Sequence, residues 1–411
     1  MTATLAPLAA LLLSVALLLM GNGLLGTLLP VRAQIELFST VDIGILGSFY
    51  FIGFAGGCYF GPFVVRRVGH IRTFTAAVSL VSTLALAHAL VVDPLLWWPT
   101  RALTGFCFAI LYMVIESWLS EQSTNENRGF VFSVYTIINL VVITIGQMML
   151  AFGDPTAFPL FAVASILVSL AVLPVALTSA PAPAPIASVK IRLGQLYESS
   201  PIGVAGALAV GLANGAFWSL APLFAQRSPS VLGTTGIAVF MSSTVIAGAV
   251  GQWPLGRLSD AIDRRMVILI TCAGAASAGI GMSVFAARWE WAVLVFSVLY
   301  GAFAFPLYAL CAAHTNDSVE TGGFVEAASG LLLLYAAGAA VGPLVAAVAM
   351  RFLGEAGLFL FTSAVHTTMA VFAVHRLRHH VRPSQEDREP FADSLRIAKT
   401  IGPLDPLADR D

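Results

Sequence analysis

The stretch Arg101–Gly129, RALTGFCFAILYMVIESWLSEQSTNENRG, decides the fold of this chain. It is apolar enough to lie in a membrane, yet it carries Arg101 near one end and Glu116 towards the other. At about 100° per residue, Arg101, Gly105, Tyr112 and Glu116 fall on one helix face, within a stripe of roughly 60–80°. A charged group at mid-bilayer costs at least ~2.5–3.5 kcal/mol. Two such groups on one stripe therefore predict a helix that borders a path for a solute.

The composition of the whole chain agrees with a membrane protein. Of 411 residues, 58% are hydrophobic and only 10% are charged, and the mean hydropathy is +0.87. Soluble domains carry roughly 25% charged residues, so we predict an all-α integral membrane protein. A net charge of −1 gives no argument for a nucleic-acid partner. The four cysteines lie in apolar runs without metal-ligand spacing, and no metal or cofactor is expected.

Twelve apolar stretches of spanning length follow one another along the chain. They lie near 4–29, 42–65, 72–92, 95–120, 130–152, 156–178, 201–225, 234–256, 265–287, 290–313, 324–350 and 357–376. An Ala-Pro repeat that cannot propagate a helix separates the two sets of six. The predicted domains are a six-helix bundle (1–178), a linker (179–200), a second bundle (201–376) and a tail (377–411).

The distribution of lysine and arginine sets the orientation. If the N-terminus is cytoplasmic, the inner segments hold 16 of these residues and the outer segments four, and Arg101 lies within a helix. By the positive-inside rule both termini, the linker and the tail are cytoplasmic. We expect a multi-pass protein of a bacterial inner membrane, with the lipid bilayer as its surroundings.

The two halves repeat each other. Asn22–Pro30 (NGLLGTLLP) matches Asn214–Pro222 (NGAFWSLAP) at an offset of 192 residues, as does Pro62 with Pro254. In the fourth and tenth helices the offset is 196, where Gly105 and Tyr112 match Gly301 and Tyr308. A drifting but ordered offset indicates a duplicated six-helix unit, and transporters built in this way bind solute near mid-membrane between their repeats.

These features resemble the major facilitator superfamily over residues 1 to about 376. Its signature loop, Gly-x-x-x-Asp-Arg/Lys-x-Gly-x-Arg, is well kept between helices 8 and 9 as Gly256, Asp260, Arg264 and Arg265. The copy between helices 2 and 3 departs from it: Pro62, Arg66, Arg67 and Gly69 place an arginine where the aspartate belongs. The resemblance therefore implies the aspartate's contact with a neighbouring helix for the second half and leaves it in doubt for the first.

Shorter motifs resemble the YcaD-type bacterial transporters of this superfamily. They are GPFVVRRVGHIR (Gly61–Arg72), ESWL (Glu116–Leu119), AHTND (Ala313–Asp317), FVEAASGLLLLY (Phe324–Tyr335) and the tail sequence LDP (Leu404–Pro406). Arg101-Ala-Leu-Thr-Gly105 also resembles a superfamily motif of helix 4. The resemblance implies a major facilitator fold and a transporter, and it names no substrate.

Seven residues are candidates for a substrate cavity. For Arg101, anion binding and snorkelling to the outer interface both fit the sequence. For the asparagines, a cavity hydrogen bond and helix packing beside small residues both fit. The aromatic residues suit either pocket lining or packing. The candidates are Asn22, Arg101, Gly105, Tyr112, Asn214, Trp218 and Tyr308.

Four residues are candidates for a cytoplasmic gate or for proton coupling. Glu116 and Arg128 flank the turn between helices 4 and 5, and His314 and Glu326 flank the turn between helices 10 and 11. In the superfamily these helix ends meet at the inner mouth, which implies that the two hairpins face each other. The alternative is that each pair only fixes its own hairpin. On a straight tenth helix His314 lies ~140° from Gly301, and a kink at Pro306 would change that angle.

The function expected from the sequence is secondary active transport of a small solute by alternating access. Proton coupling and export are preferred, and no nucleotide-binding loop or catalytic constellation indicates an enzyme. One alternative is a uniporter or antiporter without a proton step. Another is a membrane sensor or assembly protein that acts through the tail. The expected partners are the solute and protons, and the expected state is a monomer.

Overall fold

The computed structural model describes residues 8–123, 127–177, 192–228, 231, 233–319, 324–379 and 391, which are helical apart from short connections. Twelve helices among them are long and apolar enough to cross a membrane, as the sequence predicted. In chain order the elements are α2 (Ala9–Ile35), α3 (Thr40–Val68), α4 (His70–Leu90), α5 (Pro94–Glu121), α6 (Arg128–Met148), the 3-10 helix η2 (Met149–Phe152), α7 (Phe158–Leu170), α8 (Val172–Ala176), α9 (Leu193–Ser199), α10 (Pro201–Arg227), α11 (Gly233–Ala261), α12 (Arg264–Phe285), α13 (Glu290–Ala304), α14 (Leu307–Asn316), α15 (Phe324–Leu353) and α16 (Ala356–His379).

Aspartates placed directly before two helices fix where these helices begin. Asp93 accepts a hydrogen bond from the Leu95 backbone N–H at 2.7 Å, and Pro94 occupies the first turn of α5. Asp263 accepts from the Arg265 backbone N–H at 3.0 Å at the start of α12. The first N–H groups of a helix have no intrahelical acceptor, so a side-chain oxygen at this position satisfies one of them.

The sixth and tenth predicted spans are each interrupted. The tenth divides into α13 and α14 at Phe305–Pro306, where the sequence located a kink. Proline lacks an N–H and clashes with the preceding turn, so the helix cannot continue regularly through it. The sixth divides into α7 and α8 at Ala171. The last residues of the predicted linker form the short helix α9, and residues 178–191 lie outside the described part of the chain.

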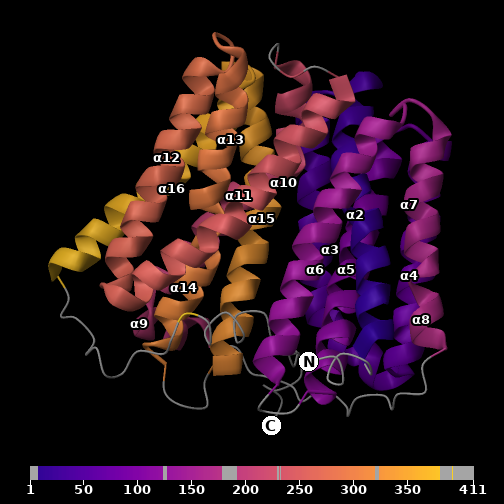
Figure 1. Cartoon of the computed structure of the whole chain (residues 1–411), viewed down its shortest axis with the longest axis horizontal. Helices are drawn as coiled ribbons and strands as arrows, with labels where there is room; N and C mark the ends of the chain where they lie inside the picture. The colour runs from indigo at the N-terminus through magenta and orange to yellow at the C-terminus, as the bar shows by residue number, and fades with distance from the viewer. Residues whose placement is uncertain are drawn as a thin grey trace. The chain divides into compact units, whose positions relative to one another are not determined.

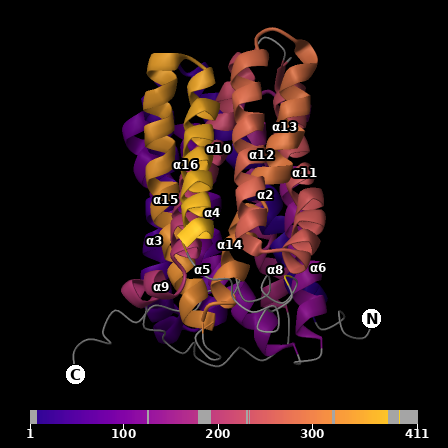
Figure 2. The ribbon, with the colours of Figure 1, turned by 90° about the vertical axis from the view of Figure 1, so that its left-hand side faces the viewer.

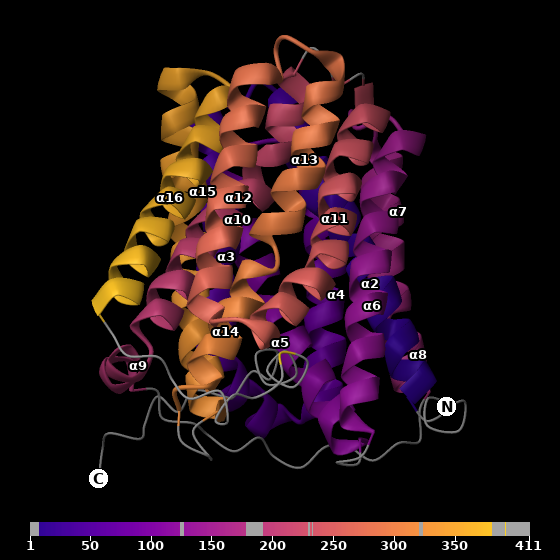
Figure 3. The same ribbon diagram turned by 60° about the vertical axis from the view of Figure 1, so that its left-hand side comes forward.

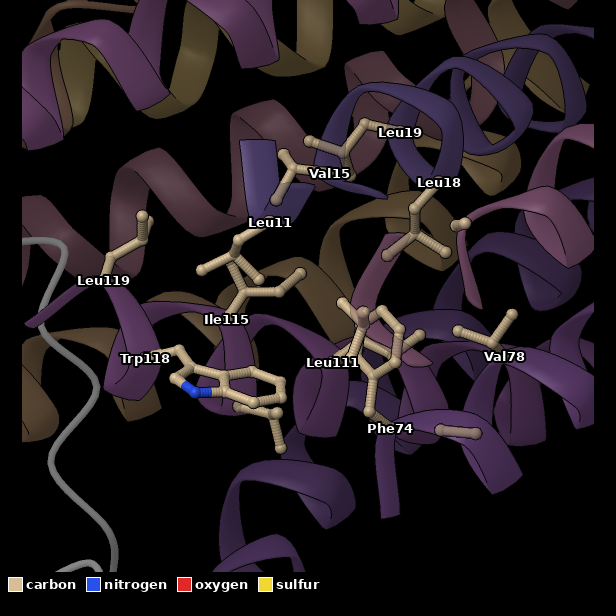
Figure 4. Packing of buried hydrophobic residues seen from close by; sticks show 14 of the residues in the cluster. Leu11, Val15, Leu18, Leu19, Phe74, Val78, Leu111, Ile115, Trp118 and Leu119 are labelled. Carbon is tan, nitrogen blue, oxygen red and sulfur yellow. The ribbon is translucent and has the colours of Figure 1, made fainter. Parts of the chain in front are cut away.

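Two compact units divide the chain. The first comprises the described parts of residues 1–37 and 49–190, drawn in indigo to magenta in Figure 1. Within it, α2 packs against α6, α7 and α8, and α4 packs against α5 and α7. The apolar faces of these helices meet in one core, where Phe74, Leu111 and Trp118 are at most 2% exposed (Figure 4). Between membrane-spanning helices, close packing of such large side chains holds the unit together.

The second unit comprises residues 38–48 and 191–400, as far as they are described. In it α10 packs against α14, α15 and α16, and α12 packs against α13 and α16 (Figure 2). Figure 3 shows α14 and the short helix α9 at one end of this unit. Phe217 of α10, Tyr300 of α13 and Phe359 of α16 pack ring against ring, with centroids 5.6 Å and 5.3 Å apart.

A polar connection links η2 to α7 in the first unit. Arg32, at the end of α2, donates to the Pro155 carbonyl at 3.2 Å and to the Thr156 carbonyl, and it pairs with Glu36 at 2.7 Å. Hydrogen bonds from the side chain and backbone N–H of Thr156 lower the pKa of Asp154, which is exposed. These contacts hold the turn against the end of α2.

Candidate functional site

A polar cluster in the first unit surrounds Arg101 of α5. The Arg101 guanidinium lies over the Tyr50 ring of α3, with Cζ 4.4 Å from the ring centroid. The Tyr50 hydroxyl is hydrogen bonded to the side chain of Asn22 on α2. All three residues are partly exposed. Asn22 and Arg101 were both predicted as site residues, and the structure joins them through Tyr50.

The Arg101 cation has few polar contacts of its own. Its Nη1 atom is buried and has no hydrogen-bond partner among the described residues. The ion pairs found in the same part of the chain do not include Arg101. A buried charge without a counter-ion is costly. The arrangement is therefore suited to receiving an anionic group from outside the chain.

Aromatic rings continue from this cluster along α3 and α5. The centroids of Tyr50 and Phe54 are 6.5 Å apart, and those of Phe54 and Tyr112 are 6.3 Å apart. Phe108 lies 6.3 Å from Tyr112 on the same helix. Tyr112, predicted as a cavity residue, thus belongs to a run of rings at distances typical of aromatic pairs.

Two matching glycines bring helices together. A Cβ on Gly105 would meet the Tyr50 carbonyl of α3, and a Cβ on Gly301 would meet the Thr244 carbonyl of α11. In both units a glycine at the same position of the repeat therefore permits backbones to approach closely, as small residues do in membrane helices. Gly105 was predicted to line a cavity, and the contact seen here is with α3.

Glu116 lies in the second-last turn of α5, which ends at Glu121, and is partly exposed. The Tyr135 hydroxyl of α6 donates to Glu116 Oε1 at 3.5 Å, and Tyr135 is 1% exposed. The sequence paired Glu116 with Arg128, whose side chain lies outside the described part of the chain. Sequence reasoning missed Tyr135, which stands on a different helix, and nothing in the local pattern marks it.

In the second unit the predicted cavity residues stand on α10 and α14. Asn214 is 7% exposed, and its Oδ1 atom has no partner among the described residues. Trp218 stacks on Phe305 with centroids 5.5 Å apart and planes inclined by 10°. Tyr308 meets Tyr335 of α15 edge to face at 5.4 Å. These aromatic residues pack ring against ring within their own unit.

The structure describes His314 and Glu326, the second predicted gate pair, but not the whole turn between them. His314 is 8% exposed on α14, and its carbonyl accepts a hydrogen bond from the Ser318 hydroxyl at 3.1 Å. Glu326 lies in the first turn of α15 and is partly exposed. Residues 320–323 between them lie outside the described chain. The gate therefore stays a prediction from the sequence.

The second signature loop contains a buried arginine. Arg264, 2% exposed, donates to the Ala313 carbonyl at 2.8 Å and pairs with Asp317 at 3.0 Å. Asp260, at 3.4 Å, supplies a second carboxylate, and Arg265 pairs with Asp263 at 2.8 Å. This network ties the start of α12 to the end of α14. Asp317 lies in the AHTND motif, but only the fold shows that it reaches Arg264.

A residue of the tail contacts the same loop. The Phe391 backbone N–H donates to Asp260 Oδ1 at 2.8 Å. Its ring, 6% exposed, lies against Gly256 and joins the apolar core of this unit. A Cβ at position 256 would meet the ring directly, so glycine is required for this contact. No pattern in the sequence indicated this contact.

The first signature loop has a different structure. Pro62 lies within α3, and Arg66 and Arg67 are exposed in its last turn. Cations are favourable there because the carbonyl ends of a helix carry partial negative charge. Gly69 has a φ of 90°, which glycine adopts without strain, and α4 begins directly after it.

The described residues contain no group of three histidine, cysteine, aspartate or glutamate side chains placed to hold a metal ion. The four cysteines are free and buried.

Comparisons with known proteins define the class. The nucleoside transporter NupG superposes with a TM-score of 0.76 at 12% identity, over 91% of this chain and 100% of its own. A bacterial homologue of the human lysosomal transporter Spinster gives 0.67 at 14% identity, over 98% and 99% of the two chains. Residues 205–404 match the model of the Major Facilitator Superfamily. The chain has the fold of these transporters, and the sequence of its second half is similar to the superfamily model.

The particular relatives are the MFS-type transporters called YcaD. That of Escherichia fergusonii is 26% identical over 385 residues, which cover 92% of this chain and 97% of the relative. That of Shigella sonnei has the same identity and coverage. The resemblance to YcaD-type transporters drawn from short motifs is confirmed along nearly the whole chain.

Proposed function

We propose that this protein is a secondary active transporter that moves a small solute across a bacterial inner membrane, with both termini in the cytoplasm. Transport proceeds by alternating access, is driven by the proton gradient and runs as export. The family and the twelve spans support the transport step. Among the structural neighbours, FucP of Escherichia coli is a fucose:proton symporter, with a TM-score of 0.56. It is an example of proton coupling on this fold.

The observation that carries proton coupling is the position of Glu116. It is a carboxylate within a membrane-spanning helix, beside the hydroxyl of a buried tyrosine. A charged carboxylate is costly at such a position, and protonation removes the charge. A group that gains and loses a proton as its surroundings change has the property that a coupled transporter requires. Glu326, in the first turn of α15, is the second candidate.

Purified protein in proteoliposomes tests this proposal. Solute-driven proton movement is measured with an internal pH dye for the wild type and for Glu116→Gln and Glu326→Gln. The expected result is loss of proton movement in at least one variant, with solute exchange retained. Glu121→Gln is the matched control because Glu121 is an exposed carboxylate at the end of the same helix as Glu116. Unchanged proton flux in both test variants would show that these carboxylates do not carry the proton, as in a uniporter or solute antiporter.

Transport assays in vesicles of a single orientation test the direction of solute movement. Right-side-out vesicles with an outwardly acidic gradient should lose loaded solute faster than vesicles without a gradient. Faster uptake under the same gradient would indicate symport into the cell instead. Cysteine labelling at positions in the α2–α3 connection and in the tail checks that the termini lie on the cytoplasmic side.

Gating by the four predicted residues is a separate part of the proposal. His314 is buried in the last turn of α14, and Glu116 stands in the second-last turn of α5. Glu116→Ala should change the turnover rate more than the affinity for the solute, since a gate acts on the conformational step. A change confined to the solute's KM would assign Glu116 to binding.

The contact of Phe391 with Asp260 makes the sensor alternative worth testing. Deletion of residues 379–411 should leave most of the solute flux if the protein is a transporter. A wild-type protein without flux for any solute of a broad panel, whose tail captures a cytoplasmic partner, would support the sensor instead.

A further inference from the structure

We propose that Asn22, Tyr50 and Arg101 bind the carboxylate of a small aromatic monoanion. This substrate class rests on the proposed transport function and makes it more specific. The three residues come from three helices of the first unit and are joined by the cation–ring contact and the hydrogen bond described above. Each residue is partly exposed, and the buried Nη1 atom of Arg101 has no hydrogen-bond partner among the described residues.

The charge of Arg101 is the first argument. The chain provides a direct comparison in Arg264, a second arginine with little exposure, which has two carboxylates and a carbonyl as partners. Arg101 lacks a carboxylate partner within the described residues and leaves Nη1 without an acceptor. An arginine held inside a membrane span for structural reasons alone would be expected to resemble Arg264. A ligand carboxylate would supply the missing counter-ion.

The donors around the cluster suit a carboxylate. A guanidinium group binds a carboxylate through two parallel N–H···O bonds. The ammonium group of lysine cannot form this pair of bonds. The Tyr50 ring lies over one face of the guanidinium, with Cζ 4.4 Å from the ring centroid, and this contact does not use the N–H groups. The Tyr50 hydroxyl and the Asn22 amide add neutral donors at the border of the same cluster.

The surroundings suit a planar apolar body. Phe54 and Tyr112 continue the ring run from Tyr50, at 6.5 Å and 6.3 Å between successive centroids. Aromatic groups pack favourably against such rings in stacked or edge-on arrangements. The carboxylate at Arg101 and the aromatic body beside Phe54 would therefore use neighbouring parts of α3 and α5.

Open space lies one turn after Asn22 on α2. A Cβ at Gly26 would meet no atom within 4 Å, whereas Gly23 on the same helix lies close to the Ile143 backbone of α6. Residues four apart share a helix face, so the room at Gly26 adjoins Asn22. Close packing of α2 against α6 accounts for a glycine at position 23. The same reason does not account for a glycine at position 26.

The second unit has no cation at the position that repeats Arg101, so this positive charge belongs to the first unit alone. The repeat offset of 196 maps Arg101 onto Ser297, and the offset of 192 maps Tyr50 onto Ser242. Ser297 is 1% exposed and shares a hydrogen bond with the Ser243 hydroxyl at 3.1 Å. The cluster of Asn22, Tyr50 and Arg101 itself holds one cation, which matches a ligand with one negative charge.

Binding to the purified full-length protein in detergent tests the proposal, with benzoate as the probe. Benzamide and benzylamine are the neutral and cationic matches. Isothermal titration calorimetry should show benzoate binding at least about tenfold more tightly than benzamide, and benzylamine should not bind. Arg101→Gln should weaken benzoate binding by about 10–100-fold, as expected for hydrogen bonds to a charged group, and leave benzamide unchanged.

Further variants separate binding from folding. Arg101→Lys keeps the positive charge but loses the paired N–H donors of the guanidinium. Its affinity for benzoate should lie between those of the wild type and Arg101→Gln. Gly26→Phe should fill the space beside Asn22 and weaken benzoate binding with no fall in melting temperature. Arg351→Gln is the matched control, since Arg351 is an exposed arginine at the end of α15. Equal affinity for benzoate and benzamide, or wild-type benzoate affinity in Arg101→Gln, would overturn the site.

Flux measurements keep this proposal distinct from the proposed function. Arg101-dependent benzoate binding with benzoate flux in proteoliposomes supports both. The same binding without flux for any panel solute supports the anion site and overturns transport. Flux of a neutral solute by a protein that does not bind benzoate supports transport and overturns the anion site.

Discussion

The two signature loops start from related sequence patterns and differ in structure. In the α11–α12 loop, Asp260, Arg264 and Asp317 form a charged network around a buried guanidinium. In the α3–α4 loop, Arg66 takes the place of Asp260 and is exposed, and the buried His70 begins α4 where Arg264 begins α12. The first loop lacks both the aspartate and the arginine of this ion pair, so it cannot form the network. Burying a guanidinium as deeply as Arg264 requires carboxylate or carbonyl partners that offset the loss of its hydration.

The largest expected effect follows from removing the buried partner. Asp317→Ala leaves Arg264 with the Ala313 carbonyl and the exposed Asp260, and it should destabilise the second unit by about 3 kcal/mol. Thermal unfolding in detergent, followed by a thiol-reactive dye on the four buried cysteines, measures it. At the repeat offset of 196 the matched control is Glu121→Ala, an exposed residue that should have almost no effect. Similar losses of stability in Asp317→Ala and Glu121→Ala would contradict the difference between the two loops.

The tail contact is expected to be intermediate. Phe391→Ala removes a ring that is 6% exposed and should lower stability by about 1–2 kcal/mol, since the tail can also detach and leave no cavity. Limited proteolysis should cleave the tail faster in this variant. Phe391→Leu keeps most of the apolar contact and should behave nearly as wild type. Unchanged proteolysis in Phe391→Ala would show that the contact does not hold the tail.

Removing Asp260 should cost less than removing Asp317. Its side chain is 42% exposed and lies 3.4 Å from Arg264, so the ion pair is screened and contributes about 1 kcal/mol or less. Asp260→Asn keeps an acceptor for the Phe391 N–H and should be milder than Asp260→Ala. A melting-temperature series over Asp317→Ala, Asp260→Ala and Asp260→Asn gives the order. Equal effects of Asp317→Ala and Asp260→Ala would contradict the burial argument.

The smallest effect is expected from restoring the aspartate in the first loop. Arg66→Asp should change stability by less than about 1 kcal/mol, because position 70 holds a histidine rather than an arginine and an acidic group at a helix end opposes the dipole. Adding His70→Arg tests whether a pair can be rebuilt there. A gain above this size from Arg66→Asp alone would reveal a cationic partner in the first unit.

Part of the candidate site was predicted from the sequence and part was not. Arg101, Glu116 and Asn22 stand out locally because polar groups are rare in spanning segments. Tyr50 was one of several aromatic residues until its ring was found over Arg101. Nothing in the surrounding sequence distinguishes Tyr135 as the partner of Glu116 or Phe391 as the partner of Asp260. Gly105 belongs to a recognisable motif, but its contact with the Tyr50 carbonyl depends on how α3 and α5 pack.

The membrane class and the twelve spans were predicted from the sequence, which also indicated the duplication and the resemblance to the superfamily. Each of these depends on hydropathy, charge placement or spacing along one segment, which are properties of the chain before it folds. The tertiary structure decided which side chains meet: Arg101 with Tyr50, Glu116 with Tyr135, and Arg264 with Asp317. These partners stand on different helices, and their contact depends on the rotation and depth of each helix against its neighbours. Packing between helices sets the rotation and the depth of each helix. A local sequence pattern does not determine them.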